Sequence, residues 1–340
     1  MTLTRTPRPR PAIHDSDWEG VRLHVVTGKG GTGKTTVAAA LALALASDGG
    51  RVLLLEVEGR QGIAQLFDVA PLPYAELKVA VAPGGGDVYA LAVDAEAALL
   101  EYLDLFYRLG RAGKALERLG AVDFATTVAP GLRDVLLTGK AYEAVRRKGP
   151  DGRAAYDAVV MDAPPTGRIT RFLNVNTAVA GLARVGPVRA QADSIMALLA
   201  SPSTAVHVVT VLEEMPVQET MDGVVELRRA GLPVGGVVVN MTRPPRLARG
   251  ELAAAAEGRL DRDTLAAGVK AAGLEASETL VDALLAEAAE HAERVALEAS
   301  ERVGLAELDR PTYELPLLAD GVDLGSLYQL AERLREQGAA

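Results

Sequence analysis

Residues 27–36 read TGKGGTGKTT, and this glycine-rich stretch decides what can be expected of the fold. It follows an apolar run at 21–26 and precedes an Ala/Leu-rich run at 37–46, so its glycines lie where a strand gives way to a helix. The first turn of such a helix offers unpaired backbone N–H groups to an anion. We therefore expect a phosphate-binding loop. The alternative is a glycine-rich turn before a buried helix, without a ligand.

The spacing of this stretch matches the P-loop pattern G-x4-G-K-[ST], with Gly28 and Gly33 as its two glycines. In this pattern Lys34 reaches the β- and γ-phosphates of a nucleoside triphosphate, and the Thr35 hydroxyl coordinates Mg²⁺. A second lysine, Lys29, gives the variant K-G-G-x-G-K-T. The loop residues expected to contact the nucleotide are Gly28, Lys29, Gly30, Gly31, Thr32, Gly33, Lys34, Thr35 and Thr36.

The bulk composition fits a globular protein and excludes several kinds of site. Length alone, at about 150 residues per domain, suggests two domains for 340 residues, although the arrangement of motifs described below favours one. The net charge of −9 argues against wrapping a phosphate backbone, so no nucleic acid partner is expected. Because the chain has no cysteine, it can form no disulfide, thiolate zinc site or iron–sulfur cluster. The four histidines, His14, His24, His207 and His291, show no metal-ligand spacing.

The N-terminal segment, residues 1–19, is rich in proline and arginine and has no apolar centre. It resembles neither a signal peptide nor a membrane anchor, and we expect a disordered tail. No later stretch supplies the roughly 18 uninterrupted apolar residues that a spanning helix needs. The sequence thus predicts a cytoplasmic protein without direct membrane insertion.

Short β-branched runs alternate with helical stretches along most of the chain, which predicts a parallel sheet covered by helices on both faces. Two long stretches, 95–147 and 247–303, contain no such run and read as helical insertions. We expect an α/β fold of the P-loop NTPase class, a single domain over 20–335 with a mostly parallel sheet flanked by helices. The predicted strands are Val21–Val26, Arg51–Val57, Val88–Val93, Ala158–Met161, Val206–Val211, Val234–Val239 and Tyr313–Leu315.

An apolar strand that ends in a carboxylate supplies the second half of a nucleotide site. The run 156–162, YDAVVMD, is followed by APPTG. In a P-loop protein this Walker B strand places its carboxylate, here Asp162, in the Mg²⁺ shell opposite Thr35. Taken alone it could be an ordinary strand end. Gly167 allows the backbone to move, so the segment could act as a switch loop.

GKGGTGKTT together with DAPPTGRITRFL resembles the arsenical-pump ATPase and tail-anchored-protein targeting ATPase family, within the deviant Walker A class. The wording VEGRQGIAQLFD and GVDLGSLY is most similar to actinobacterial anion-transporting ATPase homologues. The resemblance implies hydrolysis of ATP to ADP with Mg²⁺. It also implies a dimer in which Lys29 reaches the phosphates bound by the partner, either a second copy or a paralogue.

The first switch departs from the family pattern T-D-P-A-H. Its aspartate aligns with Glu58, and Gly59, Arg60 and Gln61 replace the Pro-Ala-His. The resemblance assigns Glu58 to orienting or deprotonating the attacking water. Because the extra methylene moves the carboxylate by about 1 Å, slow hydrolysis is the expectation, with Glu56 as a possible substitute.

The resemblance adds residues on the adenine side. Glu213 aligns with a nucleotide-contacting glutamate, although Glu214 leaves a one-residue ambiguity. Asn240 is expected to hydrogen-bond adenine, because its amide offers both a donor and an acceptor. Pro316 and Leu317 are expected beside the ring. Each of these residues could instead belong to a turn or to the core.

The metal features of the family are missing. Its metalloid and zinc sites use cysteines, so no metalloid or zinc site is expected in this chain. Targeting members hold a client helix in a methionine-rich groove. Here Met196 is the one methionine in a plausible groove helix, and the apolar helical face in the first insertion could equally be core. That face comprises Leu99, Leu100, Leu103, Phe106, Tyr107 and Leu109.

Three functions remain open at this point. The leading one is a dimeric, Mg²⁺-dependent ATPase whose nucleotide state moves a helical subdomain that binds an unidentified protein client. The second is a nucleotide-gated scaffold or regulatory subunit with negligible hydrolysis, paired with a paralogue. The third is a partition or septum-positioning ATPase, which the balanced charge of the C-terminal segment 324–340 disfavours.

Overall fold

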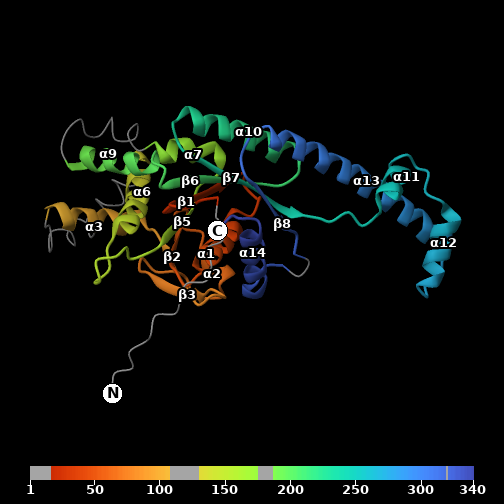
Figure 1. Cartoon of the computed structure of the whole chain (residues 1–340), viewed down its shortest axis with the longest axis horizontal. Coiled ribbons are helices and arrows are strands. Elements are labelled where there is room, and N and C mark those ends of the chain that lie inside the picture. The colour runs from red at the N-terminus through yellow and green to blue at the C-terminus, as the bar shows by residue number, and fades with distance from the viewer. Residues whose placement is uncertain (1–16, 108–129, 175–186, 319–320) are drawn as a thin grey trace, which may run out of the picture.

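A computed structural model describes residues 17–107, 130–174, 187–318 and 321–340. Within these residues an eight-stranded sheet forms the centre of the molecule (Figure 1). The strands are β1 Leu23–Gly28, β2 Arg51–Glu56, β3 Leu77–Val81, β4 Asp87–Ala92, β5 Ala158–Asp162, β6 Thr204–Thr210, β7 Val234–Thr242 and β8 Thr312–Pro316.

The strand order is β3-β4-β2-β5-β1-β6-β7-β8, and every neighbouring pair is parallel except β3 with β4. The expected mostly parallel α/β sheet is therefore confirmed, and each of the seven predicted strands corresponds to one in the structure. Strand β3 was missed. Four of its five residues are exposed or half-buried, and its place at the edge depends on pairing with β4 and on the ion pair between Lys78 and Asp87, at 2.6 Å.

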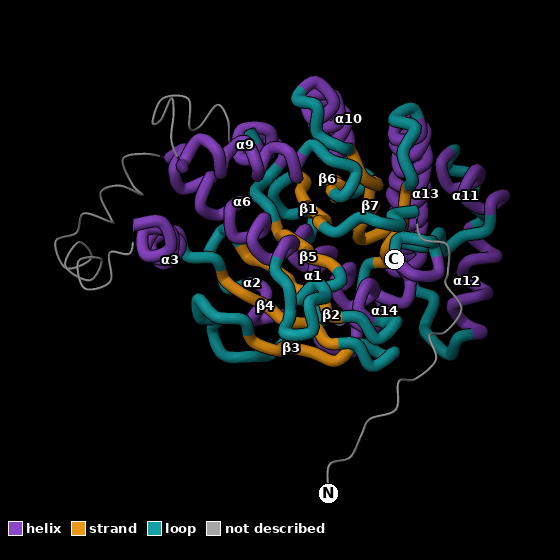
Figure 2. The backbone as a smooth tube through the Cα atoms, turned by 60° about the vertical axis from the view of Figure 1, so that its left-hand side comes forward, coloured by secondary structure: helices purple, strands orange, loops and turns teal. Residues whose placement is uncertain are grey.

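Helices cover both faces of the sheet (Figure 2). The P-loop helix α1 packs on one face of the sheet together with the C-terminal helix α14. The small alanine side chains of α1 allow it to approach the sheet closely, and ten of its residues are buried. The aliphatic side chains of α6, α7, α9 and α10 form a second core on the opposite face. The helices around the body are α1 Lys34–Ala46, α2 Gly62–Leu66, α3 Ala95–Tyr107, α6 Pro130–Arg146, α7 Thr166–Leu173, α9 Pro187–Leu199, α10 Glu214–Arg229 and α14 Leu324–Glu336.

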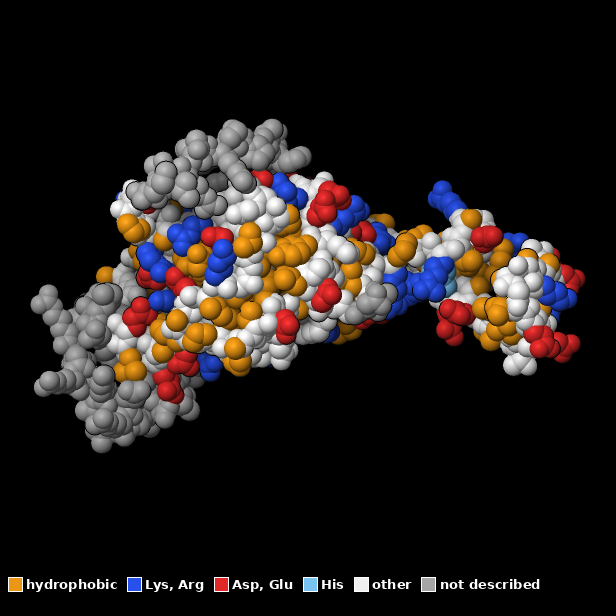
Figure 3. Space-filling model, turned by 90° about the horizontal axis from the view of Figure 1, so that it is seen from below, with side chains coloured by type: hydrophobic (Ala, Val, Ile, Leu, Met, Phe, Trp, Pro, Cys, Tyr) orange, Lys and Arg blue, Asp and Glu red, His pale blue; other side chains and the backbone are white. Residues whose placement is uncertain are grey.

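The second predicted insertion forms an arm that projects from the body (Figures 1 and 3). It consists of α11 Arg249–Ala256, α12 Arg262–Ala271 and most of the long helix α13 Glu278–Ala306. Side-chain caps begin two of these helices: Asp261 accepts from backbone N–H groups of α12, and Ser277 accepts from Leu280 N. The first insertion contains α3 and α6, while residues 108–129 lie outside the described part of the chain.

The body begins earlier than the boundary at residue 20 that the sequence suggested. Asp17 and Trp18 lie in a turn that packs on the sheet: Tyr313 donates its hydroxyl to Asp17 Oδ2 at 2.7 Å, and Trp18 stands edge-on to His207 at 5.0 Å. The predicted disordered tail otherwise falls on residues 1–16, outside the described residues. In the described ranges, none of the helices has the length and apolar character needed to cross a membrane.

Two histidines far apart in the sequence, His24 on β1 and His207 on β6, lie stacked in the middle of the sheet. Gly236 N donates to His207 Nδ1 at 3.1 Å, which leaves the proton on Nε2 to bond His24 Nδ1, also at 3.1 Å. Burial lowers the pKa of His24 to about 4 and lowers the pKa of His207 well below its ordinary value, with the neighbouring His24 and Arg310 adding to the latter shift. Both rings are therefore neutral in the fold.

Acid should destabilise the protein through this pair. Because the pKa of His24 is lower in the folded state than in the unfolded state, the unfolded state binds protons more readily below about pH 6.5. The free energy of unfolding is therefore unaffected above that pH and falls as the pH approaches 4, by roughly 3 kcal/mol for His24 alone. The free energy of unfolding, measured in denaturant from pH 7.5 to 4.5, should therefore fall less steeply in a His24→Leu, His207→Leu double variant. His291→Gln, on the arm, serves as control. Equal slopes in the double variant and the wild type would contradict the assignment.

Candidate active site

The two motif glycines of the P-loop are required by close packing. Gly28 ends β1 against β6, and a Cβ there would collide with the carbonyl oxygen of Val209. Gly33 precedes α1 with φ of 82°, and a Cβ there would collide with the amide of Asn240. Because Gly33 is in the left-handed region, the chain can turn directly into the helix, and the first N–H groups of α1 face the loop.

The side chains of the loop hold its shape and leave a cation available. Thr32 is buried, and its hydroxyl donates to the Lys29 carbonyl at 2.9 Å, closing the turn. The ammonium of Lys34 reaches the same carbonyl only at 3.5 Å. Burial lowers the pKa of Lys34, while Asp162 and Glu58 oppose that shift. A mostly buried ammonium with a single long hydrogen bond is suited to a phosphate group.

The Walker B carboxylate meets the P-loop helix as expected. Thr35 Oγ1 donates to Asp162 Oδ2 at 2.7 Å, joining the start of α1 to the end of β5. Burial raises the pKa of Asp162 to about 6, against the hydrogen bond from Thr35. A desolvated carboxylate beside a hydroxyl is an oxygen donor pair that fits Mg²⁺. The following loop is also tied to the P-loop, since Thr27 Oγ1 donates to the Pro164 carbonyl at 2.6 Å.

Glu56, considered as a substitute base, has a structural role. Its carboxylate is 2% exposed and accepts hydrogen bonds from the backbone N–H groups of Gln61 and Ile63, the latter at 3.2 Å. These bonds fix the first switch at the beginning of α2. Because each oxygen of this buried carboxylate already accepts a backbone N–H, Glu56 is less suited than Glu58 to orient water at the phosphate.

Glu58 lies beside the P-loop between two arginines. Arg60 approaches Glu58 Oε2 at 3.6 Å and Arg168 of α7 approaches Oε1 at 3.7 Å. The Glu58 side chain is 17% exposed, so water can reach it. Its position is compatible with the predicted catalytic role.

Lys29 forms an ion pair that the sequence did not reveal. Its ammonium lies 2.7 Å from Glu219 Oε1 on α10, and both side chains are partly exposed. The run VLEEMPVQET contains three glutamates, and the sequence pointed to Glu213 or Glu214 rather than to Glu219. Glu213 instead precedes α10 as its N-cap residue, is exposed, and makes no side-chain capping bond.

The adenine-side residues lie at the ends of β7 and β8. The Asn240 amide is buried and donates to the Thr32 carbonyl at 2.9 Å, which places this residue against the P-loop. Pro316 ends β8, and the Leu317 N–H bonds the Thr242 carbonyl at 2.8 Å. The chain positions expected to surround adenine are thus adjacent to one another.

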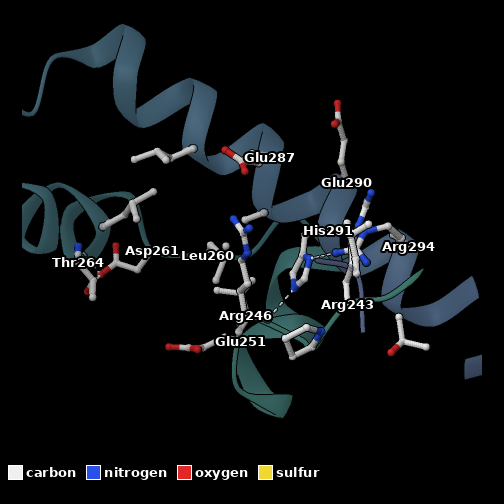
Figure 4. Close-up of a pocket in the computed structure, with 17 residues that line it drawn as sticks. Arg243, Arg246, Glu251, Leu260, Asp261, Thr264, Glu287, Glu290, His291 and Arg294 are labelled. Atoms are coloured by element: carbon white, nitrogen blue, oxygen red, sulfur yellow. Dashed lines mark hydrogen bonds between the residues drawn. The ribbon is translucent and has the colours of Figure 1, made fainter. Parts of the chain in front are cut away.

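A cavity of about 1100 Å³ opens between the end of β7 and the arm (Figure 4). Thr242 and Leu317 are among the residues that line it, so it adjoins the adenine side rather than the phosphate loop. Both signs of charge line it, and charge alone therefore selects no ligand. The charged lining residues are Arg243, Arg246, Arg294, Glu251, Asp261, Glu287 and Glu290, with His291 among them.

The apolar residues proposed for a client groove are in part core residues. Leu99 is buried, Leu100 is half-buried, and Met196 is half-buried against the core under α9. The other members of the predicted face, Leu103, Phe106, Tyr107 and Leu109, lie outside the residues whose side chains are described.

Comparison with known proteins agrees with the geometry of the site. The profile of the anion-transporting ATPase family matches residues 21–200. The protein ATPase BagA of Mycobacterium tuberculosis is 58% identical over 319 residues, 94% of each chain. The arsenical pump-driving ATPase of Acidiphilium multivorum is 28% identical over 258 residues, covering 71% of this chain and 42% of that protein. With a family match over half its length and a close relative over nearly all of it, this chain belongs to the anion-transporting ATPase family, and its activity is ATP hydrolysis.

Proposed function

We propose that the protein is a cytoplasmic, Mg²⁺-dependent ATPase that works as a dimer and relays the state of its nucleotide to the helical insertion. The hydrogen bond of 2.7 Å between Thr35 and Asp162 carries the proposal, because it brings both candidate Mg²⁺ ligands to the beginning of the P-loop helix. When bound there, Mg²⁺ would neutralise charge on the β- and γ-phosphates. Membership of an ATPase family favours this function over a scaffold with negligible hydrolysis.

The residues around the loop suit distinct tasks in hydrolysis. Lys34 binds the phosphates through its ammonium, whose hydrogen-bond donors are largely unused in the structure. Glu58 orients the attacking water and accepts its proton, since its carboxylate is reachable by water and lies near Lys34. Lys29 supplies a cation to the nucleotide of the partner, which is a second copy or a paralogue. No cysteine is available for a metalloid site such as that of arsenical pumps, so the partner bound by the insertion is proposed to be a protein.

A continuous set of contacts supports the relay from the first switch to the insertion. The Gln61 side chain bonds the Leu72 backbone twice, accepting from its N–H at 2.7 Å and donating to its carbonyl at 3.3 Å. Two residues later, the Tyr74 hydroxyl donates to Glu101 of α3. Lys140 of α6 donates to both oxygens of the same carboxylate at 3.0 Å.

A second branch fixes the end of α6. Glu76 accepts a hydrogen bond from Arg147, which directly follows α6, and another from the Tyr156 hydroxyl beside β5. The segment 72–76 therefore contacts both helices of the first insertion. Its other end is held by Gln61, whose own N–H bonds Glu56. Movement of the first switch would pull on α3 and α6 through this segment.

Hydrogen exchange of the 95–107 and 130–146 helices tests the proposal. In the wild type, Mg²⁺ with a non-hydrolysable ATP analogue should change exchange there by about fivefold, corresponding to a coupling of about 1 kcal/mol. Chelation of Mg²⁺ should abolish the change. Gln61→Ala should keep the nucleotide-dependent protection of α1 but lose the change in α3 and α6.

Gln218→Ala is the matched control, because Gln218 is exposed and its side chain bonds, among the described residues, only Asp222, one turn further along α10. It should behave as the wild type does. Exchange in the wild-type insertion that is insensitive to nucleotide would contradict the relay. A wild-type protein that binds the analogue equally well without Mg²⁺ would contradict the metal assignment.

A further inference from the structure

Two exposed arginines stand beside the Glu58 carboxylate without donating a hydrogen bond to it. Their distances, 3.6 Å for Arg60 and 3.7 Å for Arg168, permit an ion pair but exceed hydrogen-bonding range. The Arg60 side chain is 74% exposed and makes no hydrogen bond or other ion pair within the described residues. Its donors are therefore available to another acceptor at the mouth of the P-loop.

The two arginines come from different segments of the chain. Arg60 lies two residues before Gly62, which packs against Thr35 at the beginning of the P-loop helix, since a Cβ on Gly62 would stand 3.3 Å from Thr35 Cγ2. Arg168 belongs to α7, and its charge opposes the burial that raises the pKa of Asp134 on α6. Arg60 is thus the arginine of the segment that packs on the P-loop.

The backbone that follows Arg60 is fixed. Gln61, with φ of 57°, is anchored by Glu56 and by the backbone of Leu72. An arginine beside an anchored residue can redirect its exposed side chain without moving the rest of the switch. Its planar fork of donors matches phosphate oxygens better than an ammonium does.

We propose that Arg60 is a catalytic residue that donates to the γ-phosphate oxygens from the same subunit as the P-loop. The proposal rests on the proposed placement of ATP at Lys34. In the step concerned, the water oxygen bonds to the γ-phosphorus, and the bond to the β,γ-bridging oxygen breaks with its electron pair leaving on ADP. The water proton passes to Glu58 and then to the released phosphate. Arg60 compensates the charge on the γ-phosphate oxygens during this exchange.

The test compares Arg60→Ala and Arg60→Lys with Arg153→Ala, an exposed arginine in the turn before β5. Arg60→Ala should lower kcat by about 100-fold, within the range for loss of one preorganised donor. Affinity for ADP should not change, while affinity for ADP with aluminium fluoride, which mimics the transferring phosphoryl group, should fall by a similar factor. Arg60→Lys should recover part of both losses. Arg153→Ala should match the wild type.

A second measurement separates contact with the phosphate from an effect through Glu58. In a Glu58→Gln background, Arg60→Ala should still weaken binding of ADP with aluminium fluoride. An unchanged or raised kcat in Arg60→Ala, or no weakening in the Glu58→Gln background, would overturn the proposal. Failure of the wild type to bind Mg-ATP, or full binding by Lys34→Ala, would instead overturn the nucleotide site itself.

Discussion

Lys29→Ala is expected to lower kcat for ATP hydrolysis by about 10³-fold, the lower end of the effect of a cation supplied in trans. The affinity for ATP should stay within about threefold of the wild-type value, because the cation acts on charge that develops in the transition state. Steady-state phosphate release and calorimetric titration measure the two quantities. Unchanged turnover would remove Lys29 from the mechanism.

The ion pair of Lys29 with Glu219 makes this prediction sharper. A lysine engaged at 2.7 Å with its own α10 cannot at the same time reach a neighbouring subunit. Because both side chains are partly exposed, breaking the pair costs about 1 kcal/mol or less, which a dimer interface can offset. Glu219→Gln should therefore leave kcat per dimer unchanged and raise the active fraction at low protein concentration by up to about fivefold.

Mixing two inactive variants tests whether Lys29 acts across the interface. A dimer of one Lys29→Ala subunit and one Glu58→Gln subunit has a site that retains Glu58 and receives Lys29 from the partner. The mixture should hydrolyse ATP although each variant alone does not. No recovery, in a mixture shown to exchange subunits, would contradict trans action between copies of this chain.

The sequence predicted which residues the structure brings together around the P-loop, such as Thr35 and Asp162, because each part of that site is marked by a local pattern. The glycines of the loop must adopt their backbone conformations next to the residues they serve, and Asp162 ends the strand that places it. The edge strand β3 could not be predicted from the apolar pattern, because most of its residues are exposed or half-buried and need not be apolar.

Contacts between distant segments could not be predicted in the same way. Glu219 contacts Lys29 because α10 packs beside the P-loop. The two residues are 190 positions apart, and no sequence pattern shows that Glu219, rather than Glu213, is the glutamate that pairs with Lys29. Similarly, the family pattern has histidine where this chain has Gln61, and the sequence does not show that the Gln61 amide bonds the backbone of Leu72. The buried His24 and His207 pair arises from neighbouring strands far apart in sequence.

Glu58→Gln is expected to lower the single-turnover rate of ATP hydrolysis by about 10³-fold, within the range for loss of a positioned general base. The amide can neither accept the water proton nor attract the water as strongly. Glu58→Asp shortens the side chain to that of the family pattern. It keeps a carboxylate that can accept the water proton but moves that carboxylate by about 1 Å, which can change the rate by up to about 100-fold, so its rate should stay above that of Glu58→Gln.

The Glu56→Gln variant tests whether Glu58 or Glu56 is the general base. Because both Glu56 oxygens accept backbone N–H groups, an amide there would direct its own N–H at a donor and should cost about 1–3 kcal/mol of unfolding free energy. Its hydrolysis rate, measured well below its melting temperature, should exceed that of Glu58→Gln by at least about tenfold. If Glu58→Gln hydrolysed ATP at the wild-type single-turnover rate while Glu56→Gln did not, the water would be placed by the buried carboxylate, and the hydrogen bonds that hold the first switch would have to break during turnover.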